Sequence, residues 1–112
     1  MLFSKELLKG SIEIIVLQVL DELEEAYGYQ LLSSIQELSG DIFQFQESTI
    51  YPLLYRLEDK GLLSSDSKTA PSGKERRYYR LTKMGLNALK DKKTEFAHFF
   101  SGMKRVLKFS EI

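Results

Sequence analysis

The sequence predicts a mainly α-helical fold that carries one β-hairpin, an α+β arrangement of four helices and two strands. Apolar residues recur at helical spacing in four segments. A tip rich in turn residues separates two short segments with strand-like patterning. The 112 residues are enough for one domain. Because a domain of this size buries only about two-thirds of its unfolded surface, pairing with a second copy would help it to form a stable core.

The first predicted helix spans residues 5–23, and its apolar residues cover more than one stripe. A helix that is apolar on several sides is buried on several sides. Part of the cover is therefore expected from a partner subunit, with Ile12 and Ile15 as candidates for a dimer core or an effector pocket. The acidic residues within 21–25 are interpreted as a solvated face, which is the usual setting of a charge run.

The second predicted helix spans residues 27–39 and ends before Gly40, a residue type common at helix C-termini. Tyr27 and Tyr29 stand at its start. One of them is expected in the core and the other near a nucleic-acid backbone, and the sequence leaves open which. Residues 43–46 alternate Phe and Gln, which fits either a short strand or an extended link.

The third predicted helix starts between Ser48 and Tyr51, because proline is tolerated only in a first turn and Pro52 follows. Either Ser48 or Thr49 is expected to cap it, and Gly61 to end it. The same two hydroxyl residues are candidates for phosphate contact, since a helix N-terminus attracts anions. Capping alone is the alternative.

This third helix has one apolar face and one unusual polar face. The apolar residues fall at i, i+3, i+4 and i+7 and are Ile50, Leu53, Leu54 and Leu57. The other face has hydroxyls, phenols and a guanidinium where an ordinary surface helix has Lys and Glu: Thr49, Tyr51, Pro52, Tyr55 and Arg56. Such groups bond phosphates and base edges, so a nucleic-acid groove is the favoured partner.

These polar residues also have structural alternatives. Tyr51 or Tyr55 would instead pack under the hairpin as part of the fold. Arg56 would pair with Glu58 or Asp59 rather than with a phosphate.

The hairpin is expected from residues 62–67 and 76–81, on either side of a turn-rich tip at 68–74. The formal net charge of the chain is zero, yet its two parts differ. Residues 1–60 carry 4 Lys/Arg and 11 Asp/Glu, net −7, whereas residues 61–112 carry 12 and 5, net +7. A local positive patch attracts phosphates even when the total charge cancels. Lys74, Arg76 and Arg77 are the phosphate candidates, and a solvated hairpin without a target is the alternative.

The last helix is predicted over residues 83–108, with Thr82 as its N-cap. Apolar residues recur in it every seven positions, as in a helix that pairs with another helix. Its aromatic and sulfur-containing residues form either a plain dimer core or the lining of a pocket for an aromatic ligand. They are Phe96, Phe99, Phe100 and Met103.

Helix, helix, helix, hairpin is the order of a winged helix-turn-helix, in which the third helix reads DNA and the hairpin is the wing. The sequence thus predicts a winged helix-turn-helix DNA-binding domain over residues 1–82 and a C-terminal dimerisation helix over residues 83–112, within one compact unit. The link between the second and third helices is longer than the 3–4 residues of the tight motif.

No residues are arranged for catalysis or for binding a metal or a cofactor. His98 is the only histidine and there is no cysteine, which argues against a zinc site. Neither a Ser/His/Asp set nor a phosphate-binding glycine loop occurs. No segment reaches the ~20 apolar residues of a membrane span or resembles a signal peptide. We therefore expect a protein of the cytoplasm that is not an enzyme and does not contact a membrane.

Several of these segments resemble the PadR family of bacterial transcriptional regulators. They are LKGSIE at 8–13, YGYQL at 27–31, STIYPLLYRLE at 48–58, GLL at 61–63 and RYYRLTKMG at 77–85. The resemblance covers roughly residues 8–89, in the family's order and spacing. The short C-terminus is similar to the compact branch of the family, which has a single dimerisation helix.

The resemblance implies a homodimeric repressor that binds an inverted-repeat operator in double-stranded DNA. Some members of the compact branch bind flat aromatic compounds between the subunits, so a planar aromatic effector is a further implied partner. This chain has no tryptophan to stack on such a ligand, and its C-terminal phenylalanines are the substitutes. Its wing tip has Glu75, where many relatives have a Gly-Arg-Pro-Arg run. The alternative function is a winged-helix module that binds a basic protein through the acidic residues 1–60.

Overall fold

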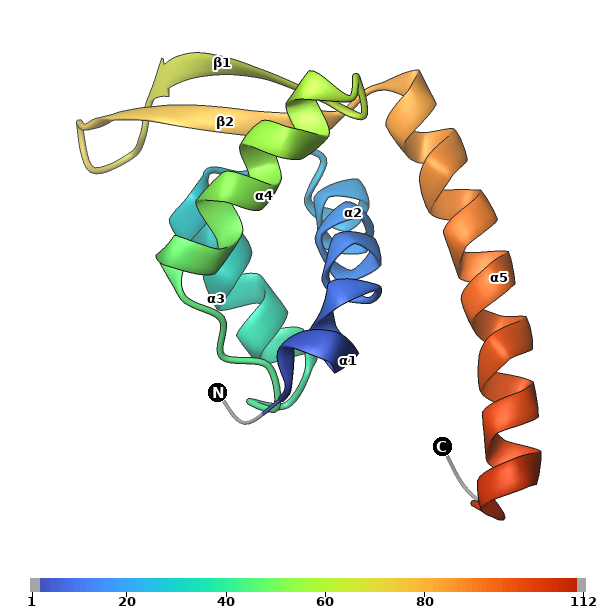
Figure 1. Ribbon diagram of the computed structural model, residues 1–112. Coiled ribbons are helices and arrows are strands. Elements are labelled where there is room, and N and C mark those ends of the chain that lie inside the picture. Colours follow the sequence, from blue (N-terminus) through green and yellow to red (C-terminus); the bar gives the residue numbers. More distant parts are fainter. Residues whose placement is uncertain (1–2, 111–112) are drawn as a thin grey trace.

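The computed structural model describes residues 3–110, which form helices and one antiparallel sheet of two strands (Figure 1). In chain order the elements are α1 (Lys5–Lys9), α2 (Ile12–Leu23), α3 (Gly28–Leu38), α4 (Glu47–Asp59), β1 (Leu63–Thr69), β2 (Glu75–Leu81) and α5 (Lys83–Leu107). The predicted fold class, a mainly α-helical winged helix with a long C-terminal helix, is confirmed. Helices α3 and α4 are the helix-turn-helix pair, and the hairpin of β1 and β2 is the wing.

The first predicted helix is two helices, so its description as one continuous helix was wrong. Helix α1 ends at Gly10 and α2 starts after Ser11. The hydroxyl of Ser11 donates to the carbonyl of Leu7 at 2.9 Å and to that of Leu8 at 3.3 Å. A serine that bonds to nearby carbonyls competes with the helix, and the glycine before it weakens the helix further.

The core lies where α2, α3 and α4 meet the wing. Its fully buried side chains are Val16, Leu17, Leu20, Leu31, Ile35, Ile50, Leu54, Leu57 and Tyr79. All four residues of the predicted apolar face of α4 are at most 2% exposed, which confirms that face. The opposite face of α4 is therefore turned away from the core.

The link between α3 and α4 covers residues 39–46 and contains no strand, so the extended alternative is the observed one. The chain turns through Gly40 and Asp41, both of which have positive φ. The hydroxyl of Ser39 then accepts a hydrogen bond from the Phe43 N–H at 2.9 Å. The rings of Phe43 and Phe45 stack with centroids 5.4 Å apart. These contacts give the long link a packed, defined path.

Helix α4 starts earlier than predicted. Its N-cap is Gln46, so the prediction that Ser48 or Thr49 caps the helix was wrong. Pro52 lies inside the helix and beyond its first turn, so the prediction that Pro52 falls in the first turn was also wrong. Proline lacks the N–H that would bond to the carbonyl four residues earlier, which belongs to Ser48. Because Ser48 is exposed, water can replace that bond.

The wing is connected to the helices by an isolated β-bridge that no sequence pattern predicts. Ala26, between α2 and α3, pairs with Tyr79 of β2. The Tyr79 N–H donates to the Ala26 carbonyl at 2.8 Å, and the Ala26 N–H donates to the Tyr79 carbonyl at 3.0 Å. Within the hairpin, β1 and β2 pair from Leu63 with Leu81 to Thr69 with Glu75.

The buried side chain of Tyr79 is expected to make the fold sensitive to alkali. Burial raises the pKa of Tyr79 to about 12, and the neighbouring Tyr55 and Glu58 add to this effect. Since a phenol in the unfolded chain ionises near pH 10, the stabilisation is complete below pH 10 and is lost as the pH rises toward 12. We expect urea denaturation to show a fall in unfolding free energy of about 2 kcal/mol over this range.

The Tyr79→Phe variant should show a clearly smaller fall, because it has no phenol to ionise. Tyr29→Phe is the matched control, since Tyr29 is exposed and its loss should leave the alkaline fall unchanged. Equal falls in the wild-type protein and in Tyr79→Phe would contradict the assignment.

Helix α5 starts at the predicted cap and packs closely against the end of α4. The hydroxyl of Thr82 accepts a hydrogen bond from the Gly85 N–H at 3.0 Å and donates to the Gly61 carbonyl at 2.6 Å. Helix α5 packs against α2 and buries Gly85 and Leu89 in its first half, and its C-terminal end extends past the other helices (Figure 1). Within residues 3–110, no helix combines the length and apolar character that a membrane span requires.

Candidate nucleic-acid interface

The outward face of α4 is a row of exposed polar and aromatic side chains. Ser48, Pro52, Tyr55 and Arg56 follow one another at i, i+4, i+7 and i+8, and all four are exposed, as is Thr49. Tyr55 has 57% of its surface exposed. We name this set (Ser48, Thr49, Pro52, Tyr55 and Arg56) the reader face. Its phenol and guanidinium groups are exposed to solvent, so packing in the core does not explain them.

Arg56 is not held by the acidic residues near it in sequence. Among the described residues it forms no ion pair, and Glu58 instead accepts a hydrogen bond from the Ser65 hydroxyl of β1 at 2.7 Å. Glu58 thus joins α4 to the wing. The guanidinium of Arg56 remains available for a partner outside the chain.

Tyr51 differs from the reader face because its ring is half-buried against α3. A Cβ placed on Gly28 would lie 2.5 Å from the ring and the hydroxyl of Tyr51. Glycine at the start of α3 is thus what allows α4 to approach so closely. Burial, and then the carboxylate of Glu47, raises the pKa of Tyr51. The ring of Tyr51 is thus part of the contact between α3 and α4.

The wing places its three predicted phosphate contacts in three different settings. Lys74 is exposed at the tip. Arg77 is exposed, and its guanidinium donates to the Ser65 hydroxyl at 3.0 Å. Arg76 is half-buried with its guanidinium 5.4 Å from the ring centre of Tyr27, so part of its role is packing. Lys74 and Arg77 are the freer cations of the wing.

Two further basic residues of the wing are neutralised within the chain. Lys68 pairs with Glu25 and lies 4.7 Å from the ring centre of Tyr78. Arg80 pairs with Asp66 across the hairpin at 3.0 Å. The effective positive charge of the wing is therefore smaller than the sequence count indicates. The pair of Arg80 with Asp66 depends on the strand register, and the periodicity of the sequence does not predict that register.

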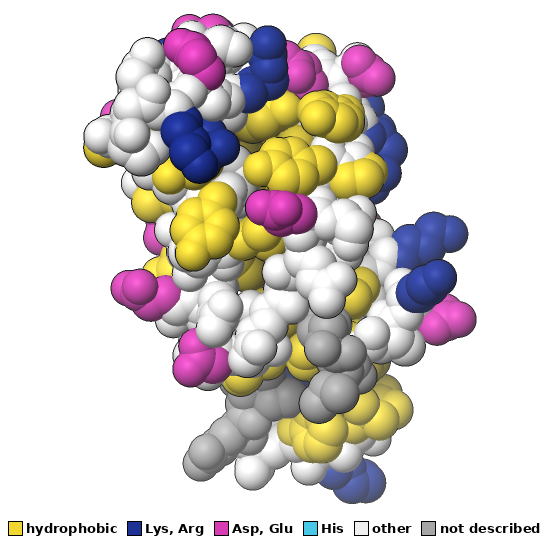
Figure 2. All heavy atoms as spheres, turned by 90° about the vertical axis from the view of Figure 1, so that its left-hand side faces the viewer, with side chains coloured by type: hydrophobic (Ala, Val, Ile, Leu, Met, Phe, Trp, Pro, Cys, Tyr) yellow, Lys and Arg dark blue, Asp and Glu magenta, His cyan; other side chains and the backbone are white. Residues whose placement is uncertain are grey.

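The two tyrosines at the start of α3 lie in different environments, one packed and one exposed. The ring of Tyr27 packs edge-on against Tyr78 with centroids 5.3 Å apart, and its N–H donates to the Gln30 side chain at 3.1 Å. Tyr29 is 62% exposed. In Figure 2, which views the molecule from the side of the wing tip, hydrophobic side chains gather in the upper half among both basic and acidic side chains.

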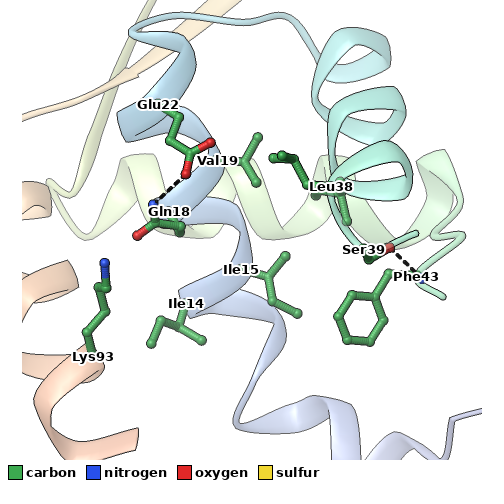
Figure 3. Close-up of a pocket in the computed structure, with 10 residues that line it drawn as sticks. Ile14, Ile15, Gln18, Val19, Glu22, Leu38, Ser39, Phe43 and Lys93 are labelled. Atoms are coloured by element: carbon green, nitrogen blue, oxygen red, sulfur yellow. Dashed lines mark hydrogen bonds between the residues drawn. The ribbon is translucent and has the colours of Figure 1, made fainter. Parts of the chain in front are cut away.

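The residues predicted for a dimer core or an effector pocket do not form one cluster within the chain. Ile12 is buried in the core. Ile15 lines an open groove of ≈ 490 Å³ between α2, α3 and α5, together with Phe43 and Lys93 (Figure 3). The remaining four, Phe96, Phe99, Phe100 and Met103, lie further along α5 and do not line this groove.

The outer part of α5 exposes many large apolar side chains. Phe96 and Phe100 pack against each other with ring centres 5.5 Å apart. The exposed set is Phe99, Phe100, Met103, Val106, Leu107 and the following Phe109. Extended apolar patches on a small protein mark interaction sites.

Within residues 3–110, no group of three or more His, Cys, Asp or Glu side chains is placed to hold a metal ion.

Comparisons with known proteins place this geometry in context. The model of the transcriptional regulator PadR-like family matches residues 16–91. The chain is 44% identical over 54 residues to Transcriptional regulator Rv3488 of Mycobacterium tuberculosis, which is 48% of this chain and 50% of that protein. It is 29% identical over 92 residues to an uncharacterised protein of Lysinibacillus sphaericus, which is 82% of this chain and 84% of that protein.

Solved structures with the same fold give a similar result. A PadR family transcriptional regulator from Eggerthella lenta superposes with a TM-score of 0.78 at 34% identity, over 94% of this chain and 88% of that chain. A PadR-like transcriptional regulator from Bacillus cereus superposes with a TM-score of 0.79 at 29% identity, over 92% and 97% of the two chains.

Proposed function

Because this chain belongs to the PadR-like family of transcriptional regulators, which are not enzymes, we propose that it binds double-stranded DNA through the reader face and the wing. The observation that carries the proposal is the reader face itself. A major groove admits one α-helix, and phenol and guanidinium groups bond base edges and phosphates there. Lys74 and Arg77 of the wing would contact phosphates beside the groove. Tyr51 supports the angle of the helix pair from within.

The DNA-binding form is proposed to be a homodimer joined through α5. The exposed apolar residues on the outer part of α5 support this assembly, because a second copy would remove them from water. A two-fold dimer would present its two reader faces about one DNA turn apart, ~34 Å, to successive major grooves. The expected target is an inverted repeat near a promoter, and the expected action is repression in the cytoplasm.

Fluorescence anisotropy with the DNA upstream of the protein's own gene tests this function. We expect tighter binding to that fragment than to a shuffled fragment of equal length and composition at moderate salt. Equal binding to both fragments would contradict sequence-specific recognition. Failure to bind any duplex at low salt would favour the alternative, a winged helix that binds a protein.

The Lys74→Ala variant should weaken binding to all DNA about equally. If Lys74 neutralises one phosphate, its loss should reduce the slope of log affinity against log salt by about 0.9. Anisotropy titrations at several salt concentrations measure this slope. Lys90→Ala is the matched control, because Lys90 is an exposed lysine of α5 and its removal changes the net charge equally. An unchanged slope in Lys74→Ala would remove the wing tip from the interface.

The groove beside α5 favours a second candidate function, release from DNA by a planar aromatic effector. Ile15 and Phe43 give the groove apolar walls, while Gln18, Ser39 and Lys93 give it polar groups (Figure 3). Ligand sites commonly have this composition. Calorimetry with planar aromatic compounds tests binding, and the compound must also change DNA affinity, since an effector acts only by preferring one state of the dimer.

A further inference from the structure

One carboxylate near the start of α2 reaches towards two other helices. The side chain of Glu13 is only 17% exposed. One of its oxygens lies 3.7 Å from the ammonium of Lys60, the residue that caps the C-terminus of α4. The other oxygen lies 3.3 Å from the ammonium of Lys92 on α5. The other ion pairs among the described residues, at Lys68 and Arg80, involve the wing instead.

This position matters because α4 and α5 have most of their packing with different elements and approach each other at Gly61, Leu62 and Thr82. Helix α4 packs against α3 and β1, whereas α5 packs against α2 and β2. At the end of α4 the chain leaves through Gly61, which has a φ of 82°. It returns to α5 through Thr82 after passing through the whole wing. Glu13 of α2 thus adds a second link, between the base of the reader helix and the side of α5.

We propose that Glu13 is a positioning residue that sets the angle between the reader helix and the dimerisation helix. This inference rests on the proposed function, in which α4 reads DNA and α5 joins the subunits. In such a dimer the angle between α4 and α5 within each subunit fixes the distance and the rotation between the two reader faces. Glu13 therefore determines which half-site spacing the dimer recognises.

The effect should be visible in DNA spacing more than in folding. Ion pairs to exposed lysines contribute little to stability, and both Lys60 and Lys92 are substantially exposed. Half-site spacing, by contrast, is a strict geometric requirement, because moving one half-site by one base pair both displaces it and rotates it about the DNA axis. A dimer whose reader angle is loosened accepts such a change more readily.

The experiment uses the full chain and a set of operators that differ only in half-site spacing. Anisotropy gives the affinity for the best spacing and for spacings one base pair shorter and longer. We expect Glu13→Gln to reduce the preference for the best spacing at least threefold. Lys92→Gln and Lys60→Gln should each reduce it in the same direction. Lys90→Gln, which removes an exposed lysine two positions from Lys92, should keep the wild-type preference.

Two further measurements separate positioning from a general loss of structure. Affinity for an isolated half-site should stay within twofold of the wild-type value in all variants. The charge exchange Glu13→Lys with Lys92→Glu should restore part of the spacing preference, because it rebuilds the link between α2 and α5.

If Glu13→Gln keeps the wild-type spacing preference, this inference is overturned and the proposed DNA binding stands. If Glu13→Gln does not fold, a wild-type preference in both Lys60→Gln and Lys92→Gln overturns it in the same way. Absence of operator binding by the wild-type protein overturns the proposed function and this inference together.

Discussion

Gly85→Ala is expected to destabilise the protein by about 3 kcal/mol, the upper part of the range for overpacking a tight contact. A Cβ on Gly85 would overlap the carbonyl oxygen of Leu62. This carbonyl has little freedom to move. It accepts a hydrogen bond from the Thr82 N–H at 3.1 Å, and the Leu62 N–H donates to the Leu57 carbonyl at 3.0 Å. Urea denaturation followed by circular dichroism measures the loss.

Gly10→Ala is the control for this substitution. Gly10 has an ordinary φ of −96°, and a methyl group on its Cα would have open space within 4 Å, so its replacement should change stability only slightly. Equal stability of the Gly85→Ala and Gly10→Ala variants would show that α5 does not approach Leu62 closely enough to exclude a side chain.

Arg56→Ala is expected to lower affinity for the operator by about 10- to 100-fold. A guanidinium that makes two bonds to a base edge contributes roughly 1–3 kcal/mol of discrimination. Because Arg56 is exposed and has no ion pair among the described residues, its removal should leave the fold unchanged. Anisotropy with operator and shuffled DNA measures the effect, and the loss should be larger on the operator.

Arg105→Ala is the matched control, since Arg105 is exposed near the far end of α5. It removes the same charge at a distance from the reader face. If both variants lose affinity equally, or if Arg56→Ala loses none, Arg56 does not read the operator.

Local patterns predicted the apolar face of α4, the cap of α5 and the wing because the causes of these features are local. The apolar spacing in α4 specified a buried face, and Thr82 capped α5 as expected. The limits of the strands differ from the predicted ones by at most two residues, since the proline and glycine of the tip favour a turn there.

Features that depend on distant partners were not predictable in this way. The bridge of Ala26 to Tyr79 has no sequence signal, because one alanine has no periodicity. Glu25 and Asp66 reduce the charge of the wing only through contacts that the folded chain creates. The start of α4 at Gln46 also escaped prediction. Its cap uses no side-chain hydrogen bond, whereas the serine and threonine nearby fit the usual capping preference.

The same limit applies to the candidate interface. Sequence placed Tyr51 and Tyr55 on one polar face, but the close approach of Gly28 half-buries the first and leaves the second exposed. Arg76 was grouped with Lys74 and Arg77, yet it packs on Tyr27. Periodicity identifies a face of an element, and packing decides which members of that face stay accessible.

Photocrosslinking from position 55 tests the central claim most directly. A benzophenone amino acid in place of Tyr55 should crosslink to bases inside each half of the operator. The same amino acid in place of Asn87, an exposed residue of α5, should give no crosslink. Crosslinks from position 87 but none from position 55, with operator bound, would show that the reader face does not enter the groove.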